Sequence, residues 1–133
     1  MSKKKILIVD DEESLLKLAS LLLSSRGYKV EAALDGRSAL DSMAKDKPDL
    51  VLLDIMMPGL NGFEVCQQIK SDVSTRHIPV IMLTAKKSSE DMYRAEQLGA
   101  EKYITKPFRS AHLIETIKQT LSGTLPHFSP EPA

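Results

Sequence analysis

Short apolar runs recur along the chain, and polar or turn-forming residues separate them. Three of these runs, Ile6–Val9, Leu50–Leu53 and Val80–Leu83, contain only apolar residues, and Val30–Ala33 and Tyr103–Ile104 are shorter or less continuous. Apolar runs of this length predict strands that are buried on both faces of a sheet. We therefore expect five strands, most of them in the interior of the protein.

Between these runs, apolar residues recur three or four positions apart, which is the spacing of one helix face. Gly27 and Gly99 are expected to end the first and fourth helices, Pro48 follows the second, and Ser89 is expected to cap the fourth. The apolar positions of the five expected helices are Leu15, Leu16, Ala19, Leu22 and Leu23; Ala39, Leu40 and Met43; Phe63, Cys66 and Ile69; Met92, Ala95 and Leu98; and Leu113, Ile114, Ile117 and Leu121.

The alternation of strands and helices predicts a single α/β domain. Such alternation favours right-handed crossovers and a parallel sheet with helices on both faces. Five βα units of this size fit a doubly wound, flavodoxin-like (βα)5 sheet with strand order 2-1-3-4-5. We expect this domain to span residues 3–122. Residues 123–133 contain three prolines and no apolar periodicity, so they are expected to form a flexible tail or the start of a truncated linker.

Composition excludes several classes of protein. The 133 residues carry 18 Lys+Arg and 18 Asp+Glu, so a nucleic-acid binder that relies on bulk positive charge is not expected. The basic run Lys3–Lys5 is interpreted as a solvated lead-in to the first strand. The single cysteine, Cys66, rules out an intramolecular disulfide and fits a reducing compartment. The chain has neither an apolar run that could span a bilayer nor the apolar core of a signal peptide, so a cytoplasmic location is expected.

Polar side chains stand at the carboxyl ends of four expected strands. Asp10 and Asp11 follow the first strand, Asp54 follows the third, Thr84 ends the fourth and Lys106 follows the fifth. Ligands of open α/β sheets bind at this edge, and strands 1 and 3 are neighbours in the expected order. Taken singly, these residues could serve as turn formers, helix caps or solvated side chains. Their joint position at one edge favours a shared site.

The chemistry of these groups points to phosphoryl transfer. Three adjacent carboxylates repel one another unless a cation relieves the repulsion, and Mg²⁺ prefers a few carboxylates together with a carbonyl and water. Lys106 supplies a positive charge for a phosphoryl oxygen, and Thr84 supplies a hydroxyl donor. With one carboxylate as the nucleophile, these are the groups that phosphoryl transfer requires.

Four motifs, in order and at the right spacing over about residues 3–122, resemble the receiver domain of two-component response regulators. No single motif would be specific, but the set of four is. The motifs are Val9-Asp10-Asp11, Leu53-Asp54-Ile55-Met56-Met57-Pro58, Leu83-Thr84-Ala85 and Tyr103-Ile104-Thr105-Lys106-Pro107-Phe108.

The resemblance implies that Asp54 accepts a phosphoryl group from the phosphohistidine of a sensor histidine kinase or a phosphotransfer protein. Asp11, Asp54 and the backbone carbonyl of Met56 would bind Mg²⁺ directly, and Asp10 would reach the metal through water. Mn²⁺ could replace Mg²⁺. Such a protein is a phosphoacceptor that catalyses its own phosphorylation and dephosphorylation, and it is not a turnover enzyme on outside substrates.

The same resemblance assigns a conformational switch. Lys106 would contact the phosphoryl group, and its peptide bond to Pro107 is expected to be cis. The Thr84-Ala85 segment would bind the phosphoryl group, with Thr84 moving onto it, and Tyr103 would swing inward behind it. Pairing with a phosphoryl group in only one arrangement would favour that conformation.

Two residues are expected to tune the lifetime of the phosphoryl group. In this family, the positions two after the phosphoacceptor and two after the threonine line the approach of water, and here they are Met56 and Lys86. Our hypothesis is that Met56 hinders the attacking water and so prolongs the lifetime.

The output of the chain is open at this point. In this family the face made by helix 4, strand 5 and helix 5 usually contacts the downstream partner. The winged-helix transcription factors of the family typically carry an acidic pair there that joins a dimer interface, whereas this chain has Glu101-Lys102. The reversed second charge weakens the expectation of that dimer. The chain would be a stand-alone receiver or a fragment of a longer regulator.

Three other classes of protein are alternatives to a phosphorylated receiver. Phosphatases of the haloacid dehalogenase type need an aspartate two residues after the nucleophile, where this chain has Met56. A flavin or nucleotide binder needs a phosphate cradle after the first strand, where Asp10-Asp11-Glu12 would repel phosphate. A pseudo-receiver that binds its partner without phosphorylation is the remaining alternative, although such domains usually lack one of the groups retained here.

Overall fold

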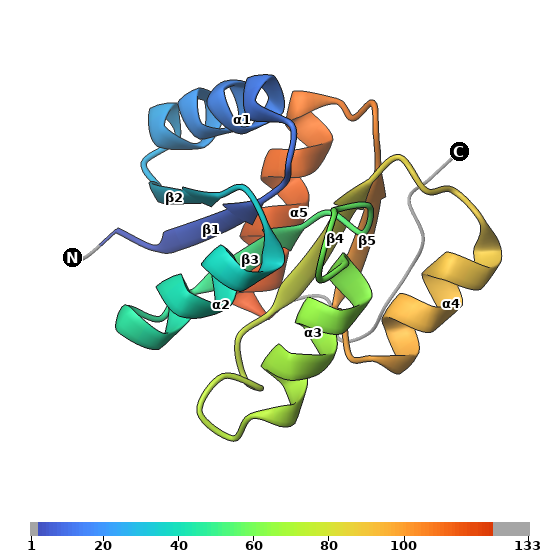
Figure 1. Cartoon of the computed structure of the whole chain (residues 1–133). Coiled ribbons are helices and arrows are strands. Elements are labelled where there is room, and N and C mark those ends of the chain that lie inside the picture. Colours follow the sequence, from blue (N-terminus) through green and yellow to red (C-terminus); the bar gives the residue numbers. More distant parts are fainter. Residues whose placement is uncertain (1–2, 124–133) are drawn as a thin grey trace.

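Five parallel strands form one sheet in the order β2-β1-β3-β4-β5, with helices on both faces (Figure 1). The computed structural model describes residues 3–123. The sheet and its strand order confirm the predicted flavodoxin-like α/β fold. In chain order the elements are β1 (Lys5–Val9), α1 (Glu13–Ser25), β2 (Lys29–Ala33), α2 (Gly36–Lys45), β3 (Leu50–Leu53), α3 (Gly62–Ser71), β4 (Val80–Thr84), α4 (Ser89–Gln97), β5 (Lys102–Thr105) and α5 (Ser110–Ser122).

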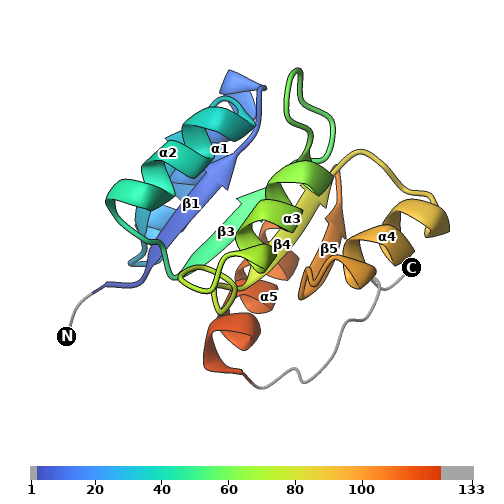
Figure 2. The same ribbon diagram turned by 60° about the horizontal axis from the view of Figure 1, so that its bottom comes forward.

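The alternation of side chains along the strands produces two apolar layers. Leu7 and Val9 of β1 pack in the layer beneath α2 and α3, whereas Ile6 and Ile8 pack in the layer beneath α1 and α5. Figure 2 shows α2 and α3 in front of the sheet and α5 behind it. Because β1, β3 and β4 are covered on both faces, their sequences are continuously apolar.

Cross-strand hydrogen bonds continue past the carboxyl ends of the strands and align the residues that follow. The Asp54 N–H donates to the Val9 carbonyl at 3.0 Å, and the Lys106 N–H donates to the Thr84 carbonyl at 2.8 Å. The Asp10 N–H donates to the Ala33 carbonyl at 3.1 Å. These bonds fix the starting points of the loops that carry the polar side chains of this edge.

The start of α4 corrects one prediction. Ser88, not Ser89, is the N-cap, and its hydroxyl accepts a hydrogen bond from the Asp91 N–H at 3.1 Å. Ser89 is the first residue of the helix. Two adjacent serines give the same capping signal, so the sequence pattern could not choose between them. Gly27 and Gly99 follow α1 and α4 with positive φ angles, as expected of residues that end helices.

The basic run at the N-terminus also differs from expectation. Lys5 is not solvated, because its ammonium pairs with Glu31 and Asp46, each at 2.8 Å. The pattern of three lysines does not reveal this, since both partners come from later in the chain.

Two further predictions concern the chain as a whole. In residues 3–123, no helix is both long and apolar enough to cross a bilayer. Of the tail predicted over residues 123–133, only Gly123 is described, and it ends α5 with a φ angle of 72°. The rest of that prediction lies outside the described residues.

Candidate functional site

Three carboxylates meet at the carboxyl edge of the sheet. Asp10, Asp11 and Asp54 each offer a carboxylate oxygen, and the three oxygens lie within 4.8 Å of one another. Asp10 and Asp54 are only 1% and 5% exposed, whereas Asp11 faces solvent. A cluster with two buried members and one open member can accept a hard cation from solution, and carboxylate oxygens are the ligands such cations prefer. The convergence predicted from the strand order is therefore present.

Lys106 brings the positive charge of the site. Its ammonium lies 2.6 Å from an Asp10 carboxylate oxygen, 3.6 Å from Asp54 and 3.9 Å from Glu12. Burial alone would lower the pKa of this ammonium, but the hydrogen bond to Asp10 and the nearby charges raise it above the usual value. Lys106 is therefore protonated at neutral pH. The peptide bond between Lys106 and Pro107 is cis, as expected.

Asp54 is held in an environment that disfavours its charge. Burial, followed by the negative charge of Asp10, raises the pKa of the Asp54 carboxyl above its usual value. Lys106 and a hydrogen bond from the Thr84 hydroxyl act in the opposite direction without cancelling that effect. Further positive charge nearby would stabilise the charged form of this carboxyl. A bound cation would therefore lower the pKa of Asp54.

The switch residues form a connected chain of hydrogen bonds. Thr84 is fully buried, and its hydroxyl oxygen accepts from the Lys86 N–H at 3.3 Å. The Tyr103 hydroxyl donates to the Lys86 carbonyl at 2.8 Å, and the ring is 1% exposed. Tyr103 therefore points inward in this structure, with the β4–α4 loop linked to both residues. Ala85 lies in that loop and is exposed.

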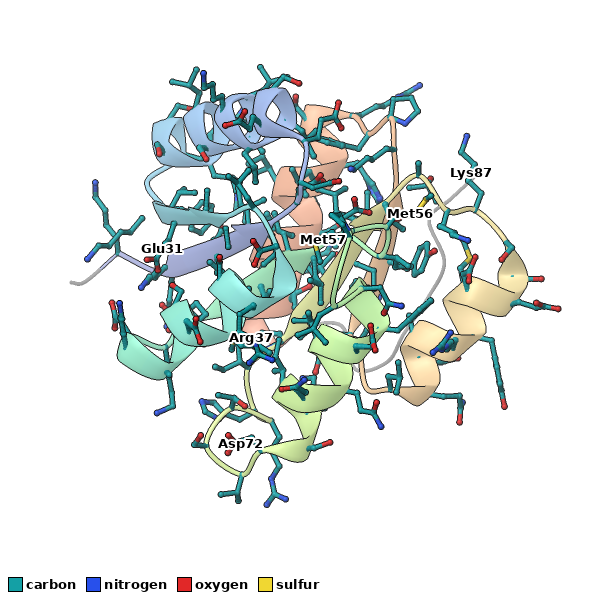
Figure 3. All side chains as sticks on the ribbon, viewed as in Figure 1. Glu31, Arg37, Met56, Met57, Asp72 and Lys87 are labelled. Atoms are coloured by element: carbon teal, nitrogen blue, oxygen red, sulfur yellow. The ribbon has the colours of Figure 1, made fainter. Side chains whose placement is uncertain are left out.

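Met56 stands at the mouth of the site. Its N–H donates to an Asp54 carboxylate oxygen at 3.3 Å, and its side chain is 55% exposed. In Figure 3, Met56 lies beside the loop that leads to α4, and Lys87 extends from that loop into solvent. Lys86 and Met56 line the same pocket.

Two features of the site were not predicted from the sequence. Glu12 reaches the site through its long contact with Lys106. Gly62 lies so close to β3 that an added Cβ would clash with the Asp54 carbonyl oxygen. This close approach depends on how α3 packs against the sheet, so no local pattern reveals it.

Together these groups can carry out one kind of chemistry. A buried carboxylate, two further carboxylates, an ammonium and a hydroxyl donor meet at this edge of the sheet. Such an arrangement fits in-line transfer of a phosphoryl group to a carboxylate.

Comparisons with known proteins agree with this arrangement. Residues 6–118 match the family model of the response regulator receiver domain. Response regulator PleD of Caulobacter vibrioides is 41% identical over 114 residues, which are 86% of this chain and 25% of that relative. The chain therefore spans about a quarter of the length of the curated relatives it matches.

Solved structures give the same result. Chemotaxis protein CheY4 of Vibrio cholerae superposes with a TM-score of 0.85 at 33% identity, covering 89% of this chain and 98% of that one. A CheY-like receiver domain protein of Methanospirillum hungatei gives 0.87 at 32% identity, covering 92% and 96%. The sheet order, the acidic edge and these similarities lead to one conclusion: the chain belongs to the family of response regulator receiver domains, which are signalling modules of two-component systems.

Proposed function

We propose that Asp54 accepts a phosphoryl group from the phosphohistidine of a sensor histidine kinase or phosphotransfer protein. An Asp54 carboxylate oxygen attacks phosphorus, a P–O bond forms, and the P–N bond to the donor imidazole breaks with its electron pair leaving on nitrogen. The observation that carries the proposal is the meeting of Asp10, Asp11, Asp54 and Lys106 at one edge of the sheet.

The acidic cluster supports a Mg²⁺ requirement, with Mn²⁺ as a substitute. Asp11, Asp54 and the backbone carbonyl of Met56 would hold the ion, and Asp10 would reach it through water. Bound there, the ion would neutralise charge on the phosphoryl oxygens and on the carboxylates. The donor set fits, because three carboxylate oxygens lie within 4.8 Å of one another and, among residues 3–123, Lys106 is the one ammonium paired with them.

The conformational switch would begin when Lys106 exchanges its acceptor Asp10 for the oxygens of the phosphoryl group. Lys106 now pairs with Asp10, and an aspartyl phosphate would offer it oxygens carrying more charge. Thr84 would donate to another of these oxygens and the Thr84-Ala85 segment would close over the group. Since Lys86 is hydrogen-bonded to Thr84 and Tyr103, movement at Thr84 would be passed to the β4–α4 loop and to α4.

We also propose that Met56 sets the lifetime of the phosphoryl group. Its half-exposed thioether stands where a water molecule would approach, and Lys86 lies on the same side. A polar residue at position 56 would orient that water. Met56→Asn is expected to speed dephosphorylation about tenfold, measured as loss of phosphoprotein over time. An unchanged rate would refute the role of Met56.

The partners and context belong to the same proposal. The domain would span residues 3–122, act in the cytoplasm without contact to membrane or nucleic acid, and control an unknown downstream protein through the α4–β5–α5 face. It would modify only itself and not turn over outside substrates. Glu101 pairs with Lys70 at 3.0 Å and accepts from the Val80 N–H at 2.7 Å, which argues against its use in the dimer of the winged-helix subgroup.

The test is phosphoryl uptake by the intact chain. The protein is incubated with Mg²⁺ and a small acyl-phosphate donor, and its intact mass is recorded. We expect a gain of about 80 Da, one phosphoryl group, that requires Mg²⁺ and is absent from Asp54→Asn. Asp46→Asn, an exposed acid at the opposite edge, is the matched control and should behave as the wild type. If neither this donor nor a phosphorylated kinase adds mass, the chain is a pseudo-receiver.

A further inference from the structure

A second pocket opens beside the acidic edge, between the β3–α3 loop and α4. It has a volume of about 510 Å³, within the range of ligand-binding pockets. Met56 and Lys86 line it where it meets the site of Asp54, and Phe63, Asp91 and Arg94 line it toward α4. The proposed function uses Met56 and Lys86 and leaves the side chains of Phe63, Asp91 and Arg94 without a role.

The pocket holds two cations that lack a carboxylate partner. Among residues 3–123, neither Lys86 nor Arg94 takes part in an ion pair. Asp91, the acid in the lining, accepts a hydrogen bond from the Ser88 hydroxyl at 2.7 Å at the start of α4. Two cations and one acid leave the lining with a net positive charge, which favours a negatively charged ligand.

Arg94 is held in place by an aromatic ring. Its guanidinium carbon lies 4.2 Å from the centroid of the Phe63 ring, which is itself 4% exposed. A guanidinium stacked on a ring keeps its N–H edges available, and those edges match the two oxygens of a carboxylate. Less side-chain entropy is lost on binding when the group is already fixed.

The remaining surface of the pocket is apolar. Met56 exposes more than half of its side chain, and Met57 and Pro58 complete this wall. Methionine is flexible and polarisable, so it adapts to aliphatic and aromatic side chains of a partner. An exposed apolar wall next to an ordered guanidinium fits a ligand with an apolar group and a carboxylate close together.

We propose that this pocket binds a short peptide segment of a partner protein in which an Asp or Glu lies next to a large apolar residue. The carboxylate pairs with Arg94 and Lys86, and the apolar side chain packs on Met56. Both Arg94 and Met56 are exposed, so a segment running across the surface reaches both. The surface lies between α3 and α4, and differs from the α4–β5–α5 face assigned to output above.

Peptide binding at this surface is coupled to phosphorylation of Asp54, an inference that rests on the proposed function. The Met56 N–H bonds the Asp54 carboxylate, and the Lys86 N–H bonds the Thr84 hydroxyl, so both walls touch the phosphorylation site. A phosphoryl group adds negative charge beside a pocket that recognises a carboxylate. One added charge at roughly 10 Å in water-like surroundings weakens binding by about a factor of two. The unphosphorylated form therefore binds the segment about twofold more tightly than the phosphorylated form.

The test begins with a displayed library of random octapeptides, selected on the unphosphorylated intact chain. Enriched peptides should place Asp or Glu within two positions of Leu, Ile, Met or Phe. For the best synthetic peptide, Arg94→Gln should raise Kd at least tenfold, whereas Arg26→Gln, at the exposed arginine that follows α1, should leave it within twofold. Amide NMR signals of Met56, Phe63 and Lys86 should shift on titration.

Three outcomes would overturn the proposal: no enrichment of acidic-apolar peptides, equal affinity for Arg94→Gln, or NMR shifts confined to another surface. Asp54→Asn should still bind the peptide, because it keeps the whole pocket. Peptide binding without phosphoryl uptake would therefore defeat only the proposed function. Phosphoryl uptake without peptide binding would defeat only this inference.

Discussion

The two edges of the sheet use the same kinds of side chain in opposite ways. At the carboxyl edge, Lys106 pairs with two of the three clustered carboxylates, those of Asp10 and Asp54. At the amino edge, Lys5 pairs with Glu31 and Asp46. A second lysine there, Lys70, pairs with Glu101 and donates to the carbonyls of Ile78 and Arg76.

The pKa values of the acidic side chains shift in opposite directions at the two edges. At the amino edge, the hydrogen bond from Lys5 lowers the pKa of Glu31 and that of Asp46, so each acid is more stable charged in the folded protein. At the carboxyl edge, burial and the charge of Asp10 raise the pKa of Asp54. The folded protein therefore favours the charged forms of Glu31 and Asp46 at the amino edge and disfavours the charged form of Asp54 at the carboxyl edge.

This contrast teaches which charges serve stability and which serve chemistry. Local rules are usually broken at functional sites, where the cost is balanced elsewhere in the structure. The lysine-centred contacts at the amino edge hold α2, α3 and the strand starts together. The unbalanced carboxylates at the other edge remain available for a cation and a phosphoryl group.

The largest effect is expected from breaking a lysine contact at the amino edge. Lys70→Met would remove the ammonium that pairs with Glu101 and donates to the Ile78 carbonyl. We expect a loss of about 3 kcal/mol in the free energy of unfolding, measured by urea denaturation. Lys118→Met, at an exposed position of α5, is the matched control. A loss for Lys70→Met no larger than that of the control would show that this contact does not stabilise the fold.

The next largest effect is expected from adding a cation at the carboxyl edge. Mg²⁺ should stabilise the wild type, by about 2.7 kcal/mol when free Mg²⁺ is a hundred times its Kd. Asp11→Asn should lose most of this gain, because it removes the open carboxylate of the cluster. Asp49→Asn, an acid at the amino edge, should keep it. Thermal unfolding with and without Mg²⁺ measures both, and equal gains in the two variants would contradict a site at Asp11.

Neutralising one acid at each edge should give effects of opposite sign. Without Mg²⁺ at pH 7, Asp54→Asn should raise the free energy of unfolding by about 1 kcal/mol, because it removes a buried charge that burial and Asp10 disfavour. Asp46→Asn should lower it, since Lys5 loses a charged partner. Urea denaturation of the two variants decides the matter, and a destabilised Asp54→Asn would show that the repulsion is already relieved.

The smallest effect is the dependence of these differences on pH. A raised pKa means that the contribution of Asp54 to stability is present below about pH 4 and is lost as pH rises through the raised value. A lowered pKa means that the contribution of Glu31 is present above its unfolded value and is lost as pH falls through the lowered value.

The two variants should therefore diverge as pH increases from about 3 to 6. Asp54→Asn should gain stability relative to the wild type, and Glu31→Gln should lose it. Urea midpoints measured across this range test the signs. Parallel curves for the two variants would mean that the two edges are electrostatically alike.

Most of the fold was predictable from local patterns. The continuously apolar segments Ile6–Val9, Leu50–Leu53 and Val80–Leu83 identified the buried strands, and helical spacing identified the helices between them. The errors were of another kind. Ser88 and Ser89 carry the same capping signal, so the pattern does not distinguish them, and the acidic partners of Lys5 lie far along the chain, so the lysine run does not reveal its ion pairs.

The candidate site, like the fold, was only partly predictable from local patterns. The position of Asp10, Asp11 and Asp54 after their strands indicated that they would meet, because parallel strands end at one edge. No local pattern shows that Lys106 contacts Asp10 most closely, or that Gly62 must be small because α3 approaches the Asp54 carbonyl. Both features depend on distances between elements.

By itself, the sequence determined the elements, their order in the sheet and the residues at its carboxyl edge, because periodicity and strand ends are local properties. Only the tertiary structure decided which charges are balanced. It paired Lys5 and Lys70 with acids at the amino edge, left Asp54 with a raised pKa, and stacked Arg94 of α4 on Phe63 of α3. Burial and charge balance are set by groups distant in sequence, so they appear only when the chain is packed.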